Sequence, residues 1–371
     1  MPHRLIPILV CAALALFGLA ATASAAPEPW GLMQLRAKGV PLPEHPAFRD
    51  TILRHPSHKA RAAAAAGTDL VLNAPDGTAL TVTISNAYGV TPTSQAAGQN
   101  AVNFLASRVH GTELGLLKVF VGPPSEISSI CGEGDASVLA CYDPGDNRMY
   151  VPGETPPNSP VPLEYIITHE FGHHIANHRR NAVGPAFNLG PEYWATSQFI
   201  CAGALSQPPV FFPGDEGEHY PLNPSEGWAE SYAHLPENGF QSAPIQTSPL
   251  FHRDQAAFDA IRRDIFQPWT GNVTRTVTGS LGRKSQQRFG LVVSLDGPVV
   301  ARLHGPRAAN YDLQVRLGGE VVDRSSTPGS NDRVGGTLCA APQQPPPNRL
   351  TIVVVRRSGS GPFKLKLTDA G

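Results

Sequence analysis

The sequence has little net charge and no long hydrophobic run beyond its N-terminal end. Its 371 residues include 29 Lys and Arg against 30 Asp and Glu, which gives a formal charge of −1. A nearly neutral chain gives no electrostatic reason to expect binding to nucleic acid or to an anionic membrane. Its scattered Asp and Gly residues form no EF-hand-like loop, so structural calcium is not indicated. Internal repeats are absent as well.

The one long apolar run lies within residues 1–25. A short basic start precedes the run from Ile6 to Ala20, and Ala23-Ser24-Ala25 forms an A-x-A cleavage site. The run is too short and too rich in alanine to argue for a permanent membrane span. We therefore expect residues 1–25 to be a signal peptide and the protein to be secreted without a membrane anchor. Residues 26–66, rich in Pro and Ala, are either a pro-segment that is removed or a loosely packed N-terminal arm.

Four cysteines remain after the signal peptide. An even count in an exported protein indicates two disulfides, for which three pairings are possible. Proximity in the sequence favours Cys131 with Cys141, and Cys201 with Cys339 then follows by elimination. Free buried cysteines are the alternative for Cys201 and Cys339.

The segment from Tyr165 to Ala176 contains the pattern H-E-x-x-H. On a helix, His169 and His173 lie on one face and can aim two imidazoles at one point. Two neutral imidazoles suit Zn²⁺, which in catalytic sites keeps three protein ligands and one water. Glu170 can then act as general base toward that water. The alternative is a helix with two surface histidines, but the apolar neighbours favour the metal, because unligated His and Glu are costly to bury.

The third ligand is not supplied by the same helix. Metzincins continue as H-E-x-x-H-x-x-G-x-x-H, whereas this chain has Ala176 at the Gly position and Arg179 at the third His. A Glu from a later helix is the other common solution.

Residues 223–233 offer such a Glu. Asn223 predicts an N-cap with Pro224 at the first helical position, and Glu226 and Glu230 then share a face. We expect Glu226 to be the ligand and Glu230 to accept the outer N–H of a ligand His. Two alternatives stay open: Glu226 closes a capping box and binds no metal, or Glu230 is the ligand.

The run H-E-F-G-H-H followed by E-G-W-A-E-S-Y resembles the gluzincins, the thermolysin-type metallopeptidases. The resemblance covers these two helices and little else. It implies one zinc per chain, with ligands His169, His173 and Glu226, the base Glu170 and the brace Glu230. It also implies an α+β, zincin-like domain with a mixed sheet, a backing helix, an active-site helix and a glutamate helix.

The predicted elements follow the order of the N-terminal half of a zincin. A hairpin over 70–84, a helix over 95–109 and strands over 116–121 and 148–151 precede the metal helix, which is expected to start at Ser159 and Pro160; helices over 192–205 and 254–266 follow. By the resemblance, the strand before the metal helix is an open edge that pairs with substrate; its residues are Asn147, Arg148, Met149, Tyr150 and Val151. An ordinary interior strand is the alternative.

The loop from Pro208 to Pro221 contains Tyr220, a few residues before the proposed third ligand. A donor opposite the metal is needed to stabilise the developing oxyanion, and a neutral phenol donates at all working pH values. We therefore name Tyr220 as a catalytic candidate. A loop tyrosine that covers apolar surface is the alternative.

Residues 67–270 are thus expected to form the metal-binding domain, and residues 271–371 differ from them. Strand-like runs over 288–293, 299–303, 311–315, 350–355 and 363–367 alternate with Gly-containing turns, which predicts a small β-sandwich. This part resembles bacterial pre-peptidase C-terminal domains.

The sequence as a whole predicts a secreted, monomeric, zinc-dependent endopeptidase that acts on proteins or peptides. Two other functions remain: an inactive zincin-fold module that binds a surface, and a zinc amidase that acts on cell-wall peptides. Retention of Glu170 favours an enzyme, because a structural zinc site does not need a general base.

Overall fold

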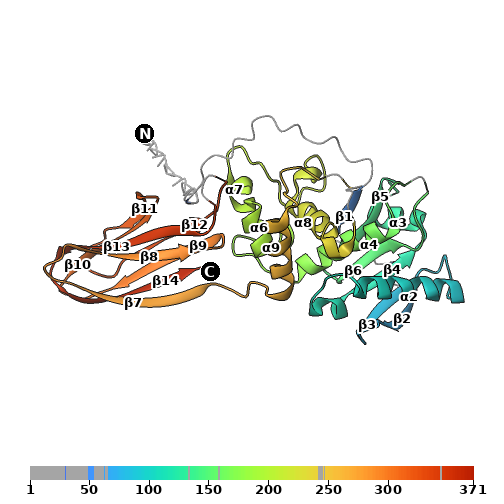
Figure 1. Cartoon of the computed structure of the whole chain (residues 1–371), viewed down its shortest axis with the longest axis horizontal. Helices are drawn as coiled ribbons and strands as arrows, with labels where there is room; N and C mark the ends of the chain where they lie inside the picture. The colour runs from blue at the N-terminus through green and yellow to red at the C-terminus, as the bar shows by residue number, and fades with distance from the viewer. Residues whose placement is uncertain are drawn as a thin grey trace, which may run out of the picture.

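A computed structural model describes residues 30, 49–53, 62, 66–132, 134–157, 159–240, 245, 247–342 and 345–371. The predicted signal peptide and most of residues 26–66 lie outside these described residues. A mixed sheet occupies one end of the elongated molecule, helices occupy the middle, and antiparallel sheets form the other end (Figure 1). Within the described ranges, no helix has the length and apolar character to cross a bilayer.

The mixed sheet has six strands in the order β1-β5-β6-β4-β3-β2. They span Arg49–Ile52 (β1), Thr68–Asn73 (β2), Ala79–Ile84 (β3), Lys118–Gly122 (β4), Val138–Asp143 (β5) and Arg148–Pro152 (β6). The pairs β2–β3 and β5–β6 are antiparallel, and the other neighbours are parallel. The predicted hairpin over 70–84 is confirmed. The strand β6 lies between β5 and β4, so the expectation that residues 147–151 form an open edge is wrong.

Helices cover this sheet and build the centre of the molecule. They are α2 (Pro92–Ala106), α3 (Pro124–Cys131), α4 (Leu163–Asn177), α5 (Ala186–Leu189), α6 (Glu192–Ser197), α7 (Ile200–Leu205), α8 (Pro224–Ala233) and α9 (Gln255–Phe266), with short 3-10 turns at Thr112–Leu116, Tyr220–Leu222 and Pro236–Asn238. One apolar core joins the sheet to α2, α4 and α8 and includes the fully buried Val119, Met149, Phe171 and Trp228.

Three helices differ from the prediction. The helix predicted over 95–109 runs from Pro92 to Ala106, because Thr91 caps it and Pro92 is its first residue. The helix α4 begins at Leu163 and not at Ser159, because Pro162 disfavours helical backbone at the residue before it. The predicted helix over 192–205 is two helices, since Phe199 adopts a left-handed conformation (φ 57°) between α6 and α7.

The C-terminal strands form two four-stranded antiparallel sheets, which we call the sandwich. Its strands are β7 (Val273–Leu281), β8 (Gln286–Val293), β9 (Gly297–His304), β10 (Asn310–Leu317), β11 (Glu320–Ser325), β12 (Arg333–Leu338), β13 (Asn348–Ser358) and β14 (Gly361–Asp369). One sheet has the order β11-β10-β13-β8 and the other β12-β9-β14-β7. Both contribute to one apolar core, which includes Leu303, Tyr311, Ile352 and Leu365. The α+β class predicted from the sequence is confirmed.

Three links attach the sandwich to the helices. Cys201 of α7 is bonded to Cys339 with 5.4 Å between their Cα atoms. The Asp296 backbone N–H donates to Thr196 Oγ1 at 3.0 Å, and Trp269 Nε1 donates to the Ala370 carbonyl at 2.7 Å. The other disulfide, Cys131–Cys141, joins α3 to β5. Both predicted cysteine pairs are therefore disulfides, as expected of a protein from an oxidising compartment.

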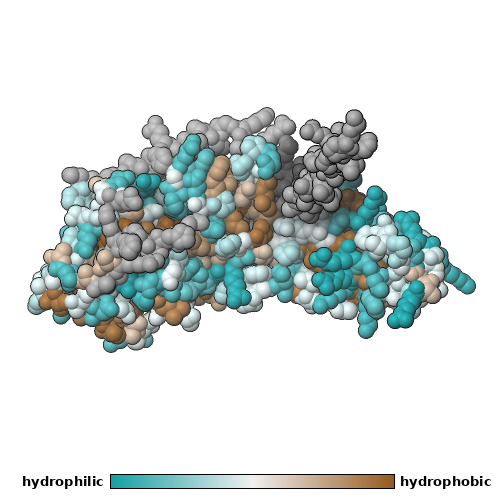
Figure 2. Space-filling model, turned by 180° about the vertical axis from the view of Figure 1, so that it is seen from behind, coloured by the Kyte–Doolittle hydropathy of each residue, from teal (hydrophilic) through white to brown (hydrophobic). Residues whose placement is uncertain are grey.

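The surface opposite the view of Figure 1 is mostly hydrophilic, with hydrophobic residues gathered near its middle (Figure 2). The large apolar side chains that are most exposed come from separate elements, such as Val71 of β2, Leu116 and Phe266 of α9. Single exposed apolar residues of this kind are normal for a soluble surface and indicate no binding site.

Candidate metal centre

The two helices that bear the predicted ligands, α4 and α8, lie directly against each other. Gly172 makes this possible, because a Cβ at this position would come within 2.9 Å of the Ala229 Cα atom. The Trp228 indole N–H of α8 donates to the Gly172 carbonyl at 2.8 Å across the contact. Asn223 caps α8 through Ser225 N, and Pro224 is its first residue, as predicted. The close approach fixes the acidic face of α8 against the imidazoles of α4.

Four side chains converge between these helices: Asp50, His169, His173 and Glu226. One donor atom from each lies within 4.8 Å of the other three, and all four residues are buried. His169 Nε2 is 3.3 Å and His173 Nε2 is 3.4 Å from Glu226 Oε2. The same imidazole nitrogens are 3.4 and 2.9 Å from Asp50 Oδ2.

These separations fit a tetrahedral metal ion. With metal–ligand bonds of about 2.0–2.1 Å, neighbouring ligand atoms of a tetrahedral zinc site are about 3.3–3.4 Å apart. Two imidazoles and two carboxylates are donors that zinc accepts. Among the described residues, no Lys or Arg forms an ion pair with Asp50, Glu226 or Glu230. A cation from outside the chain would balance these buried carboxylates.

The geometry distinguishes the two glutamates of α8. Glu226 Oε2 faces the inner nitrogens of both histidines, and its Oε1 accepts from Ser225 Oγ at 3.4 Å. Glu230 Oε2 lies 3.2 Å from the outer nitrogen, Nδ1, of His169. The structure thus brings Glu226 into the donor group and sets Glu230 behind His169. Its contacts favour neither the capping-box alternative for Glu226 nor the swapped assignment.

Glu170 is fully buried beside the four donors. Neither of its carboxylate oxygens has a hydrogen-bond partner among the described residues. Burial, and then the negative charge of Asp50, raise the pKa of Glu170 well above its ordinary value. A buried carboxylate without partners is expensive and calls for a function.

Asp50 was not predicted from the sequence. It comes from β1, in the segment interpreted as a pro-segment or arm. Burial alone would raise its pKa, but the charges and hydrogen bonds of His169 and His173 outweigh burial and lower it well below its ordinary value. The only local signal was the weak alternation of polar and apolar residues in Arg49-Asp50-Thr51-Ile52.

Tyr220 lies at the same centre. Its hydroxyl donates to Asp50 Oδ1, and the residue is fully buried. Burial and the Asp50 charge raise the pKa of Tyr220 well above its ordinary value, so the phenol keeps its proton. The predicted loop residue is therefore placed within reach of the donor group and is not a surface cover.

Other predicted or neighbouring polar residues lie elsewhere. His174 of the H-E-F-G-H-H run contacts the Tyr142 hydroxyl at 3.0 Å and the Glu113 carbonyl at 2.8 Å, away from the donors. Arg148, one of the predicted substrate-strand residues, donates to Thr83 Oγ1 at 2.7 Å. Asn147 accepts from Asn177, and Met149, Tyr150 and Val151 pack in the core. Residues 147–151 thus belong to an ordinary interior strand, which was the alternative to a substrate-binding edge.

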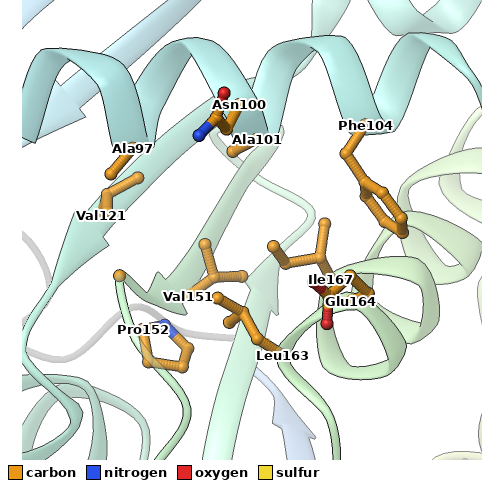
Figure 3. A pocket seen from close by; sticks show the side chains of 11 residues that line it. Ala97, Asn100, Ala101, Phe104, Val121, Val151, Pro152, Leu163, Glu164 and Ile167 are labelled. Atoms are coloured by element: carbon orange, nitrogen blue, oxygen red, sulfur yellow. The ribbon is translucent and has the colours of Figure 1, made fainter.

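A separate cavity of about 440 Å³ opens beside the start of α4. Ala97, Asn100 and Phe104 of α2 line one side, and Val151, Leu163 and Ile167 line the other (Figure 3). Its lining includes none of the four donors. This cavity is therefore distinct from the metal centre.

Comparisons with known proteins add little to this geometry. No protein-family model matches the sequence, and no curated protein is found as a relative. Over 26% of this chain, the structure is similar to the pre-peptidase C-terminal domain of a collagenase from Bacillus anthracis, covering 89% of it at 11% identity and a TM-score of 0.22. A periplasmic inhibitor of g-type lysozyme from Aeromonas hydrophila is similar over 26% of this chain and 84% of its own, at 18% identity and a TM-score of 0.21. Both likenesses concern about a quarter of the chain.

Proposed function

We propose that this chain is a secreted zinc-dependent peptidase of the gluzincin type. The observation that carries the proposal is the pairing of four converging donors with a buried, unpartnered Glu170. A site with only a structural role would have no use for that carboxylate. Two disulfides support an extracellular location, and the α4–α8 geometry supports the thermolysin-type assignment of His169, His173 and Glu226 as ligands.

A zinc ion held by these residues supplies Lewis acidity toward a substrate carbonyl and makes water a better nucleophile at neutral pH. A cation held by the four donors would oppose the rise in the pKa of Glu170 and favour its ionised form. Ionised Glu170 would accept the proton that this water loses and return it to the leaving amine. Its free oxygens are in keeping with that role, since no other described group occupies them. Glu230 holds His169 by its outer nitrogen, which fixes the imidazole tautomer and orientation.

Tyr220 is the proposed oxyanion donor. In the structure, Asp50 presents one carboxylate oxygen to the imidazole nitrogens and the other to the Tyr220 hydroxyl. A carbonyl carbon under attack by water carries two oxygens with a similar separation. The Asp50 carboxylate therefore marks where such a group would sit, and the phenol donates toward the oxygen on which negative charge develops.

The test is hydrolysis of casein and a mixed peptide library, followed by mass spectrometry of the new termini. Because Asp50 lies among the donors, both the unaltered chain and Asp50→Ala are assayed, each also with Glu170→Gln. With Glu170 intact, we expect at least one of the two proteins, the unaltered chain or Asp50→Ala, to cleave these substrates in a zinc-dependent reaction that a chelator stops. Glu170→Gln should lower the rate by roughly a hundredfold to ten-thousandfold and leave the zinc content unchanged.

Cleavage that persists in both Glu170→Gln proteins would contradict the role of Glu170 as base. Absence of cleavage of casein and the library, together with zinc-dependent release of amines from cell-wall peptides, would replace the peptidase by the amidase.

A further inference from the structure

We propose that β1 occupies the place of a peptide substrate along the β5 edge and that Asp50 closes the metal centre, so that the full chain is a latent form. This inference rests on the proposed peptidase function. It also moves the expected substrate-binding strand from β6 to β5. The occupant of that edge is the chain's own segment around Arg49–Ile52.

Asp50 takes the position that a catalytic metal site must leave open. Catalytic zinc sites keep three protein ligands and one exchangeable position, whereas structural sites are closed by four. His169, His173 and Glu226 account for three. Asp50 Oδ2, 2.9 and 3.4 Å from the two imidazole nitrogens, completes a tetrahedral set. With all four donors in place, a tetrahedral ion would have no open position for water or a substrate carbonyl.

The strand β1 lies where an extended peptide would add to the sheet. It is the end strand, and among the described residues it pairs with β5 alone, which pairs with β6 on its other side. The Arg49 N–H donates to the Ser137 carbonyl at 2.9 Å, and the Leu53 N–H to the Tyr142 carbonyl at 2.8 Å. Without β1, the edge of β5 would offer its free backbone groups to a substrate, a mode of recognition that depends little on side chains.

The pairing between β1 and β5 is irregular at Asp50. Arg49 is opposite Val138 and Thr51 is opposite Cys141, so the register shifts across Asp50. Irregularities of this kind re-aim side chains next to active sites. On the other side of β1, Arg49 Nη1 donates to the Glu216 carbonyl at 3.2 Å, in the loop that carries Tyr220. The strand is thus enclosed between the sheet edge and the loop of the proposed oxyanion donor.

The same N-terminal segment is held a second time, on the sandwich. Trp30 is 7% exposed and packs in the sandwich core. Its backbone N–H donates to the Thr337 carbonyl at 2.7 Å, and the Cys339 N–H donates to the Trp30 carbonyl at 3.1 Å. The sandwich therefore retains the segment that blocks the metal centre. Cys339 also forms the disulfide that ties the sandwich to α7.

The other five strands of the mixed sheet stay paired with one another if the segment that bears β1 is removed. The strand β1 precedes every other strand of the mixed sheet and adds to it from the end. A single peptide-bond cleavage between Leu53 and Gly67 would end its covalent connection to the sheet. The structure thus favours the pro-segment interpretation of residues 26–66 over that of a passive arm.

The test compares the zinc-loaded full chain with Asp50→Ala and Asp50→Asn. The probe is a fluorescein-labelled peptide hydroxamate, which needs a free position on the zinc, and binding is measured by fluorescence anisotropy. Zinc content and circular dichroism are recorded for each protein. Thr51→Ala is the matched control, because Thr51 lies in the same strand but gives no donor to the centre.

We expect both Asp50 variants to retain zinc and to bind the hydroxamate roughly tenfold or more tightly than the unaltered chain, because a larger fraction of molecules has an open site. Thr51→Ala should bind like the unaltered chain. Asp50→Asn keeps the shape of the side chain, so it decides the question if Asp50→Ala does not fold.

Equal hydroxamate affinity in the unaltered chain and the Asp50 variants would overturn the proposal. Loss of zinc from folded Asp50 variants would overturn it too, since Asp50 would then be an obligatory ligand. Tight hydroxamate binding by Asp50→Ala without hydrolysis of any peptide would uphold the closure by Asp50 and refute the proposed peptidase function.

Discussion

Two buried carboxylates of the sandwich, Asp312 and Asp369, have other partners than the two of α8, Glu226 and Glu230. In the sandwich, Asp369 is fully buried and accepts from Arg275 Nη2 at 2.8 and 3.0 Å, and Asp312 accepts from Arg357 Nε at 2.6 Å. Between the helices, Glu226 and Glu230 meet imidazoles. An arginine, a permanent cation of the chain, neutralises each of these two sandwich carboxylates.

The difference indicates which buried charges serve the fold and which serve a ligand. An Arg–carboxylate pair satisfies both groups and needs nothing further. Burial would lower the pKa of His169 and His173, but the carboxylates that face them raise it above its ordinary value. Asp50, Glu226 and Glu230 are three carboxylates against two imidazoles, so negative charge is left to be balanced even when both imidazoles are protonated.

Removal of a carboxylate from the metal centre should have the largest effect. We expect Glu226→Ala to lower zinc affinity by roughly a thousandfold or more, because one of the ligands of a preformed site is lost. Asp369→Asn in the sandwich removes an equally buried carboxylate and should lower stability without changing zinc affinity. Competition with a chromogenic chelator measures both. Similar zinc affinities for the two variants would contradict the distinction.

Loss of the disulfide between the two regions should come next. Cys201 and Cys339 are separated by 138 residues, against 10 for Cys131 and Cys141. By loop entropy, the double Ser variant of the long loop should lose about 5 kcal/mol of unfolding free energy, and that of the short loop about 3 kcal/mol. Urea unfolding measures both. A smaller loss for the long loop would show that the sandwich is held by its other contacts.

Removal of the carboxylate behind a ligand should have a smaller effect. Glu230→Ala leaves the donors in place but frees the outer nitrogen of His169. We expect zinc affinity to fall by about ten- to a hundredfold. The chelator competition used for Glu226→Ala gives the comparison. A larger loss for Glu230→Ala than for Glu226→Ala would reverse the assignment of ligand and brace.

The smallest effect should be on the pH dependence of stability, through Asp296, which lies where the sandwich meets α6. Burial raises the pKa of Asp296 to about 8, although a hydrogen bond from the Ala340 N–H opposes the shift. The folded protein thus keeps a proton that the unfolded chain releases near pH 4. The contribution of protonated Asp296 to the free energy of unfolding is therefore complete below about pH 4 and is lost as the pH rises through about 8. Asp296→Asn should reduce the stability loss between pH 5 and 8.5, measured by urea unfolding. An unchanged pH dependence would show that Asp296 is already ionised in the folded state.

The local part of the metal centre was predictable from the sequence. His169 and His173 follow from the helical period, and the Asn223-Pro224 start sets the face of α8 that holds Glu226 and Glu230. Gly172 in the same motif allows the two helices to meet. In each case the signal lies within one helix.

The long-range part was not predictable. The order of strands depends on pairing between distant segments, so β6 was expected at an edge that β5 and β1 occupy. Asp50 lies in four residues of strand within a Pro- and Ala-rich segment, and it reaches the centre only because β1 pairs with β5. No local pattern marks a carboxylate that a distant strand brings to the donor group.

Anomalous X-ray diffraction at the zinc edge, from crystals of the full chain grown with zinc, shows directly whether the four donors hold zinc. We expect one peak about 2.0–2.2 Å from His169 Nε2, His173 Nε2, Glu226 Oε2 and Asp50 Oδ2. A peak elsewhere, or none at this centre in a chain folded as described, would contradict this expectation.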